Sequence, residues 1–290
     1  MPSQQNPEQE HPSTYVVADR ANEEEMLRLN TQDHLLTSSM GGVLPEQTDL
    51  SRFTRILDVG CATGGWLIEV ARALPQASLR VGIDVSKRML DYAQAQAEAQ
   101  QVNERVEFHV MDALRMLEFP SQTFNLVNQR IGTGYLRTWD WQKLLQEYQR
   151  VCVPGGIVRV TEMDVTPRSN SPALMQIGEL FVQALANAGH LFTSQGDSIV
   201  NQLPKLLEQH GLQNVQTHAY TLEHRNGSSE WPGYVENTMS AFRTLAPFLR
   251  KWTQVPDDYE AIYQQMLHEI QQPDAFMIGT LVTAWGTNAL

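Results

Sequence analysis

The sequence contains only two cysteines, Cys61 and Cys152, among its 290 residues. Two cysteines are too few for a disulfide scaffold, and their spacing matches no zinc-binding motif. No other cluster of metal ligands is evident, so we expect no metal site. The chain also lacks an uninterrupted apolar run of about 18 residues, the length that a membrane-spanning helix requires. We therefore expect no membrane span.

Basic residues are scarce as well. The chain has 21 Lys and Arg against 33 Asp and Glu, a formal net charge of −12, and no basic run appears. Nucleic-acid binding depends on clusters of Lys and Arg that meet phosphates, so a nucleic-acid substrate is disfavoured. Residues 1–12 are polar and lack the apolar core of a secretory signal peptide, which favours a cytoplasmic location.

The most informative stretch is residues 55–65, which read RILDVGCATGG. Ile56 and Leu57 form an apolar run that leads to Asp58, a glycine-rich turn follows, and helical spacing restarts at Trp66. This order of strand, tight loop and helix is typical of a nucleotide-binding unit. Glycine suits such a loop because it accepts unusual backbone angles and lets a ligand lie against the main chain.

Asp58 indicates which ligand the loop binds, because it lies two residues before Gly60, the first glycine. A dinucleotide site presents bare backbone amides to a pyrophosphate, and a carboxylate at this place would repel that group. A carboxylate suits a positively charged ligand instead, since buried charges need partners. S-adenosylmethionine (SAM) carries an ammonium and a sulfonium and has no phosphate.

Residues 57–64 closely resemble the first motif of class I SAM-dependent methyltransferases. The resemblance continues through residues 128–130 to the Pro-Gly-Gly segment at 154–156, and it covers roughly residues 53–165. The sequence departs from the family pattern at Ala62, where a second glycine is common, and at Asn125, where Asp is frequent. The resemblance implies SAM as cofactor and S-adenosylhomocysteine as product.

Two further acidic residues follow at the ends of predicted strands. Asp84 lies 20 residues after Gly64 (84 − 64 = 20), the spacing at which an acid meets ribose hydroxyls. Asp112 follows a third predicted strand, and in the family that this chain resembles the corresponding acid accepts a hydrogen bond from the adenine amino group. A single strand-end Asp could be an ordinary turn former, but acids at three successive strand ends favour a binding site.

Strands alternate with helices along the chain, which predicts a parallel sheet covered on both faces. We expect an α/β, doubly wound, mostly parallel, seven-stranded, Rossmann-like sheet with helical cap insertions, and the family resemblance implies an antiparallel last strand. A turn is expected at Pro154–Gly156. The predicted strands are 55–59, 79–84, 106–111, 124–127, 157–163, 215–222 and 275–285, and the predicted helices of the core are 65–74, 87–101 and 140–151.

The chain divides into four predicted parts. Residues 1–14 form a disordered tail, 15–50 an N-terminal helical cap, and 51–165 the SAM-binding core. Residues 166–290 complete the sheet. Helical insertions at about 172–210 and 225–272 are candidate substrate lids.

An open parallel sheet binds ligands outside the carboxyl ends of its strands, and this rule selects the candidate site. The loop amides are expected to hold the methionine carboxylate, with Asp58 on the ammonium side. Met89 could equally be ordinary helix packing, Arg130 a structural ion-pair partner, and Tyr15 the anchor of a flexible arm. The predicted cofactor contacts are Tyr15, Asp58, Gly60, Cys61, Ala62, Gly64, Asp84, Val85, Met89, Asp112, Ala113, Asn128, Gln129 and Arg130.

Methyl transfer is an in-line displacement with a neutral thioether leaving group, so catalysis rests mainly on positioning and desolvation. A general base is needed only where the acceptor must lose a proton. Glu162 is the first candidate, because its strand end should face the methyl group. Further candidates are Asp164, His34, His190 and Tyr135, and for every candidate taken singly a surface or hydrogen-bonded structural role is the favoured alternative.

The sequence thus predicts a SAM-dependent methyltransferase whose acceptor is a small organic molecule, such as a secondary metabolite, a lipid-like compound or a quinone-like compound. Aromatic residues in the predicted lids favour an apolar acceptor pocket, although such residues more often belong to the core. Metal-assisted transfer of the catechol type is disfavoured. The alternatives are a SAM-binding protein without transfer activity and a nicotinamide-dependent oxidoreductase on the same fold. Neither the methylated atom nor the oligomeric state follows from the sequence.

Overall fold

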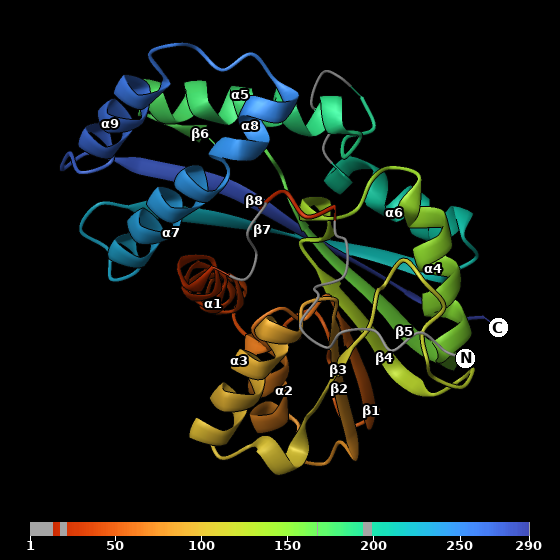
Figure 1. The fold of residues 1–290 in the computed structure, drawn as a ribbon. Helices are drawn as coiled ribbons and strands as arrows, with labels where there is room; N and C mark the ends of the chain where they lie inside the picture. Colours follow the sequence, from red (N-terminus) through yellow and green to blue (C-terminus); the bar gives the residue numbers. More distant parts are fainter. Residues whose placement is uncertain (1–13, 18–21, 167, 194–198, 290) are drawn as a thin grey trace, which may run out of the picture.

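The computed structural model describes residues 14–17, 22–166, 168–193 and 199–289, and one mixed sheet runs through them (Figure 1). The sheet has eight strands in the order β3-β2-β1-β4-β5-β8-β6, with β7 also paired to β8. The strands are β1 (Arg55–Val59), β2 (Leu79–Asp84), β3 (Glu107–Val110), β4 (Phe124–Arg130), β5 (Cys152–Met163), β6 (Arg168–Ser169), β7 (Gln213–Arg225) and β8 (Phe276–Thr287).

The predicted parallel core and antiparallel last strand are confirmed. Strands β1 to β5 pair in parallel, whereas β8 is antiparallel to both β5 and β7. The eighth strand is the two-residue β6, which was not predicted because so short a segment has no periodicity to detect. The predicted disordered tail falls, apart from Thr14, on residues 1–13, which lie outside the described residues, so this part stays a prediction.

Helices cover both faces of the parallel strands, as the doubly wound fold requires. Ile56 of β1 packs with α2 (Gly65–Ala73) and with Ala97 of α3 (Lys87–Ala99). The next residue, Leu57, points to the other face and packs with α4 (Asp140–Val151) and α6 (Ile199–Gln209). Strands that are buried on both faces read as continuous apolar runs, which is why the sequence of β1 shows no alternation.

The remaining helices gather at the far end of the long β7–β8 hairpin (Figure 1). These are α5 (Pro172–Ala188), α7 (Trp231–Thr244), α8 (Ala246–Trp252) and α9 (Tyr259–Glu269), and they share an apolar core of their own. Met163, the last residue of β5, pairs with Leu281, which pairs with Tyr220. Strand β7 continues from there to Arg225, so the hairpin and its helices stand beyond the carboxyl edge of the parallel strands. We call these four helices the cap.

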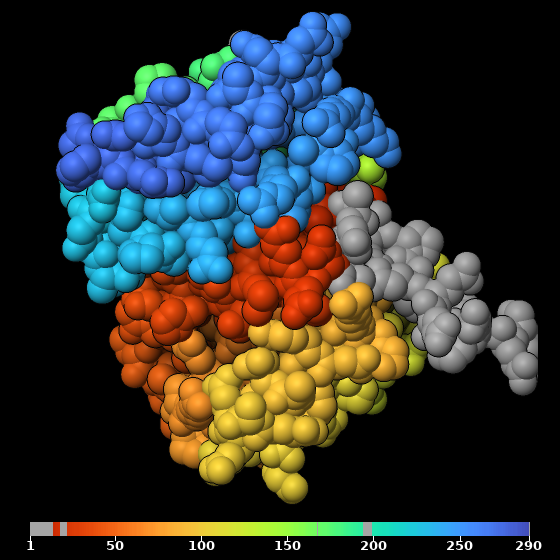
Figure 2. All heavy atoms as spheres, turned by 60° about the vertical axis from the view of Figure 1, so that its left-hand side comes forward, coloured from red at the N-terminus to blue at the C-terminus, as the bar shows by residue number. Residues whose placement is uncertain are grey.

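Helix α1 (Glu23–Met40) lies between the cap and the α2–α3 side of the core (Figures 1 and 2). It begins after Asn22, whose side chain accepts a hydrogen bond from the Glu24 amide, and it packs mainly against α7. It ends at Gly41, which adopts a left-handed φ of 84°.

The predicted turn at Pro154–Gly156 is wrong, because β5 runs through these residues. The pairing with β4 shifts register between Phe124 and Leu126, and Gly155 has a φ of 75°, so the segment is a bulge within one long strand. Asn288, which follows β8, accepts a hydrogen bond from the Gly155 amide and donates its own amide to the Gly156 carbonyl. Partners from a segment more than 130 residues away keep the chain extended here.

Candidate active site

A cavity of about 450 Å³ lies at the carboxyl ends of the parallel strands, between the core, α1 and the cap. Twelve of the residues predicted as site residues line it: Tyr15, Asp58, Gly60, Cys61, Ala62, Asp84, Val85, Met89, Asp112, Ala113, Arg130 and Glu162. Gly64, Asn128 and Gln129 do not. Most of the residues predicted from the rule that parallel sheets bind ligands at this edge therefore line the cavity, although they are a minority of its wall.

The loop after β1 bends sharply at residues with positive φ. Gly60 and Gly64 have φ values of 67° and 73°, and Ala62 between them has 47°. Gly64 is also crowded, because a Cβ there would lie 2.8 Å from the Ala93 Cβ. Glycine is thus required at position 64 for both conformation and space, and Gly64 serves as the N-cap of α2 rather than as part of the cavity wall.

Three amides of this loop already have partners inside the protein. The Cys61 amide donates to the Ile83 carbonyl at 2.9 Å, and the Gly64 amide donates to the Cys61 carbonyl at 2.8 Å. The Ala62 amide donates to the Asp84 carboxylate at 3.1 Å. The expectation that the loop amides as a group hold a ligand carboxylate is therefore too broad, because these three are engaged in fixing the loop.

Asp58 is buried and belongs to a chain of polar side chains that runs under the cavity. The Asn128 amide donates to Asp58 at 2.8 Å, and the Asn128 oxygen accepts from Arg159 at 2.7 Å. Arg159 pairs in turn with Glu46 at 2.7 Å. Burial raises the pKa of Asp58 to about 7, against the lowering effects of Asn128 and Arg159. This row of hydrogen-bonded side chains holds two carboxylates and one guanidinium. When Asp58 is ionised, one negative charge is therefore left for a ligand to neutralise.

The two other strand-end acids face the cavity as predicted. Asp84 accepts from the amides of Ala62 and Ser86, at 3.1 and 2.9 Å, which fixes the orientation of its carboxylate. Asp112 accepts from the Leu114 amide at 2.9 Å. Each acid is held by backbone donors close to it in space. Contacts of these acids with ribose and adenine stay predictions.

Asn128 and Gln129 were predicted as cofactor contacts, but both side chains are fully buried and do not line the cavity. Asn128 orients Asp58, as described above. Gln129 donates to Glu162 at 3.0 Å and accepts from the Tyr148 hydroxyl at 2.9 Å. Their position at the end of β4 was predicted correctly, but polar neighbours on β1 and β5 turn them into supports for two cavity carboxylates.

Glu162 ends β5 and fixes the turn that follows β4. Its carboxylate accepts from the Gly132 amide at 2.7 Å, from the Thr133 amide and hydroxyl at 3.2 and 2.8 Å, and from Gln129. Burial raises the pKa of Glu162 to about 7, although these hydrogen bonds act in the opposite direction. Whether Glu162 also removes a proton from an acceptor stays a prediction.

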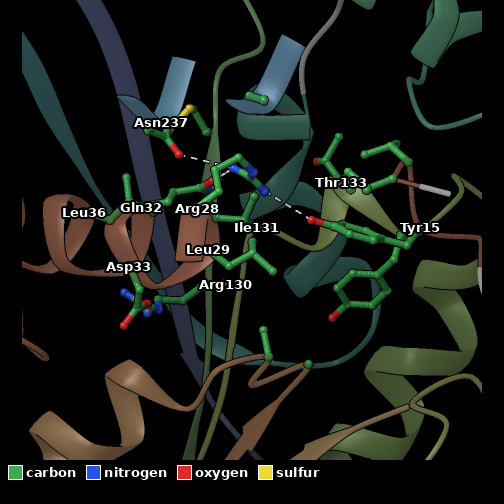
Figure 3. Close-up of a pocket in the computed structure, with 18 of the residues that line it drawn as sticks. Tyr15, Arg28, Leu29, Gln32, Asp33, Leu36, Arg130, Ile131, Thr133 and Asn237 are labelled. Carbon is green, nitrogen blue, oxygen red and sulfur yellow. Dashed lines mark hydrogen bonds and ion pairs between the residues drawn. The ribbon is translucent and has the colours of Figure 1, made fainter. Parts of the chain in front are cut away.

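Polar residues of α1 close the cavity over the core (Figure 3). Arg130 forms an ion pair with Asp33 and donates to the Thr37 hydroxyl at 3.1 Å. Burial lowers the pKa of Arg130 to about 9, which leaves it charged at neutral pH. The structural ion pair considered from the sequence is therefore present, and Arg130 faces the cavity as well.

A second polar cluster of α1 meets Tyr15 and the cap (Figure 3). The Tyr15 hydroxyl donates to Glu25 at 2.7 Å, and Arg28 binds the same carboxylate at 2.6 and 2.8 Å. Arg28 also donates to Asn237 of α7 at 3.3 Å. The sequence did not reveal these α1 residues, although residues 25, 28, 29, 32, 33 and 36 share one helical face, and polar residues on a buried face were the available signal.

The cavity continues away from the core into an apolar half under the cap. This half is lined by Met163, Val165, Leu174, Gly178, Phe181, Leu185, Leu222, His224, Tyr234, Thr238, Ala241, Phe242, Leu245 and Met277. Phe181, Tyr234 and Phe242 are among the aromatic residues of the predicted lids, from which the sequence predicted an apolar acceptor pocket. The sequence did not single out His224, because an isolated histidine in a strand carries no signal.

The other candidate bases have different surroundings. His34 is largely exposed, and Asp164 lines the cavity while accepting from Thr166 at 3.0 Å. His190 lies 2.9 Å from the Thr133 carbonyl, and burial lowers its pKa. Tyr135 lines the cavity.

In the part of the chain that the structure describes, no group of three or more His, Cys, Asp or Glu is placed to hold a metal ion. Nor does any helix among the described residues have the length and apolarity to cross a membrane. The cytoplasmic location stays a prediction.

Comparison with known proteins identifies the family. A family model described as a methyltransferase domain matches residues 56–156. A demethylmenaquinone methyltransferase of Bacillus licheniformis is 31% identical over 175 residues, which span 57% of this chain and 73% of that protein. A protein of the same name from Lactiplantibacillus plantarum is 30% identical over 203 residues, 66% of this chain and 81% of that protein.

This chain belongs to the class I SAM-dependent methyltransferases. Solved structures agree on the fold. Phosphoethanolamine N-methyltransferase 2 of Haemonchus contortus has a TM-score of 0.56 at 17% identity, covering 94% of this chain and 60% of that one. The cyclase SpnF has a TM-score of 0.52 at 19% identity, covering 96% and 99%. The nicotinamide-dependent oxidoreductase considered from the sequence is therefore set aside.

The charge pattern of the methyltransferase cavity fits SAM. Arg28 and Arg130 are the only Lys or Arg side chains among the described residues that line it, and each is paired with a carboxylate of α1. A diphosphate would find no unpaired cation among these side chains, whereas a cofactor with an ammonium and a sulfonium would meet the negative charge of Asp58.

We predict that Asp84→Ala weakens SAM binding at least tenfold, or about 1.4 kcal/mol, because ribose loses its charged hydrogen-bond acceptor. Isothermal titration calorimetry measures the change. Asp91→Ala is the matched control, since Asp91 is an exposed residue of α3 that pairs with Lys87. Unchanged affinity in Asp84→Ala would show that the strand-two assignment is wrong.

Proposed function

We propose that this methyltransferase transfers the SAM methyl group to a small, largely apolar organic acceptor bound beneath the cap. The observation that carries the proposal is the continuity of one cavity from Asp58 and Asp84 to the apolar half formed by α5 and α7. The names of the relatives, demethylmenaquinone methyltransferases, favour a flat quinone-like compound among the small-molecule classes. Secondary metabolites and lipid-like compounds of similar shape fit the same lining.

When bound, SAM would supply an electrophilic methyl group, which an acceptor atom attacks in line while the bond to sulfur breaks and the neutral thioether of S-adenosylhomocysteine leaves. The residues of this chain bind the cofactor, orient it toward the acceptor, and exclude water from the cavity. Asp58 and Asp84 fix the two polar ends of the cofactor site from adjacent strands, which places the methyl group toward the apolar half. Helix α1, held by Arg130 and by the cap residue Asn237, covers the cavity and keeps solvent from the acceptor.

His224 is the polar side chain that we propose for the acceptor. It lies on β7 with only 6% of its surface exposed, and its ring stacks on Tyr234 at 5.2 Å between centroids and 14° between planes. No hydrogen bond joins the ring to any described residue, and burial lowers its pKa, so it is neutral at pH 7. A neutral imidazole that faces the cavity can accept a hydrogen bond, or a proton, from an acceptor hydroxyl.

Glu162 remains the other candidate for this role. It lines the cavity, and its raised pKa would suit proton transfer near neutrality. Its oxygens, however, already accept four hydrogen bonds that hold the Gly132–Thr133 turn. Because those donors occupy the lone pairs that a base would use, we favour a positioning role for Glu162 and acceptor contact for His224.

The acceptor proposal is tested with SAM labelled in its methyl group and a panel of demethylated quinols, phenols, amines and phosphorylated compounds. We expect label in flat apolar acceptors and none in the phosphorylated ones. Gly178→Phe is the matched variant, because a Cβ at Gly178 meets no atom within 4 Å and the new ring would enter the apolar half. It should raise the KM for the acceptor at least tenfold and leave SAM affinity unchanged. SAM binding without transfer to any panel member would instead favour the SAM-binding protein without activity.

Substitutions at His224 and Glu162 distinguish which of the two residues acts as the base. We expect His224→Phe to lower kcat at least tenfold while the Tm and the SAM affinity stay unchanged, since the phenyl ring preserves the stack on Tyr234. Glu162→Gln should lower the Tm, because an amide cannot accept all four hydrogen bonds. If Glu162→Gln instead abolishes transfer with an unchanged Tm and SAM affinity, Glu162 is the base and the His224 assignment is wrong.

A further inference from the structure

The Tyr135 hydroxyl is enclosed in the protein and has no hydrogen-bond partner among the described residues. The backbone of Tyr135, in contrast, is held by hydrogen bonds at both its amide and its carbonyl. The Tyr135 amide donates to the Gly132 carbonyl at 2.9 Å, and the Tyr135 carbonyl accepts from the Thr14 hydroxyl. These two bonds fix the main chain of Tyr135 at the end of the η2 turn (Gly132–Gly134), while its hydroxyl is left for another partner.

This hydroxyl lies against the first glycine of the cofactor loop. A Cβ placed on Gly60 would lie 2.7 Å from the Tyr135 oxygen and 3.1 Å from the ring carbon that bears it. Any side chain at position 60 would displace the phenol, so glycine is required there for more than its φ of 67°. The absence of a side chain at position 60 lets the phenol reach the loop backbone.

The surroundings keep the phenol protonated. Burial raises its pKa first, and the negative charges of Glu162, Asp84 and Asp58 raise it further. A protonated phenol among carboxylates is a neutral hydrogen-bond donor, and none of these three carboxylates accepts its proton in the structure. A buried hydroxyl without a partner destabilises the protein, and a ligand oxygen would satisfy it.

The rest of the site leaves a need for such a donor. The amides of Cys61, Ala62 and Gly64 are engaged within the protein, and the two cavity arginines are paired with carboxylates. The methionine end of SAM carries a carboxylate as well as an ammonium. Asp58 suits the ammonium and would repel the carboxylate, so the carboxylate requires a donor elsewhere in the cavity wall.

We propose that the Tyr135 hydroxyl donates a hydrogen bond to the carboxylate of the amino-acid end of SAM. Tyr135 is then a cofactor-binding residue, not the general base that the sequence suggested as one option. The proposal depends on the family's cofactor and not on the identity of the acceptor.

The test compares three ligands by calorimetry with the whole chain. SAM and S-adenosylhomocysteine carry the amino-acid end, whereas 5′-methylthioadenosine keeps the nucleoside and the thioether without it. We expect Tyr135→Phe to weaken SAM and S-adenosylhomocysteine about fivefold to twentyfold and to leave 5′-methylthioadenosine unchanged. The Tm of the unliganded protein should not fall, because the variant removes a hydroxyl that has no partner.

Tyr148→Phe is the matched control, since its hydroxyl is equally buried but donates to Gln129 at 2.9 Å. It should lower the Tm and leave the ratio of S-adenosylhomocysteine to 5′-methylthioadenosine affinity unchanged. Two outcomes overturn the proposal. In one, Tyr135→Phe weakens all three ligands equally; in the other, it lowers the Tm of the unliganded protein and leaves every affinity unchanged. Neither outcome depends on methyl transfer, so a failure here is distinct from a failure of the acceptor assay.

Discussion

A buried carboxylate without a cation of its own is the constraint on which the site depends. Asp58 is 4% exposed, and the only guanidinium in its polar chain, that of Arg159, is already paired with Glu46. Asn128 bridges Asp58 and Arg159 through one hydrogen bond to each, but it carries no charge. An ionised buried group of this kind is costly until a cationic ligand arrives, which is how a residue at a strand end comes to select a cofactor.

The same constraint explains why the site must be covered. Electrostatic attraction between Asp58 and an ammonium is strong only where water is excluded. Helix α1 and the cap provide that exclusion, and the polar side chains that fasten α1 are themselves part of the cavity wall. The fold alone would not establish the activity, since a cyclase shares it at a TM-score of 0.52. The family match and the acids at the strand ends carry the functional conclusion.

How much of this the sequence could predict depended on whether the signal was local. Residues 55–65 contain the first strand, Asp58 and the glycine loop, and Asp84 ends the next short strand. Spacing within these short segments was enough to locate them. Asn128 and Gln129 were placed at the right strand end, but their side-chain partners could not be predicted, because those partners come from β1, β5 and α4. The bulge at Pro154–Gly156 and the orphan hydroxyl of Tyr135 result from packing between distant segments, which leaves no pattern in a single sequence.

Proton release on cofactor binding tests the role of Asp58 most directly. With a pKa of about 7 in the free protein, Asp58 is partly protonated at pH 6.5, and an ammonium beside it must lower that pKa and expel the proton. Calorimetry of S-adenosylhomocysteine binding in buffers of different ionisation enthalpy counts the protons. We predict release by the wild-type chain relative to Asp58→Asn at pH 6.5, shrinking to nothing by about pH 8.5, and an affinity that rises with pH between those limits. Identical proton counts in the two proteins, or net uptake by the wild type relative to the variant, would contradict the account.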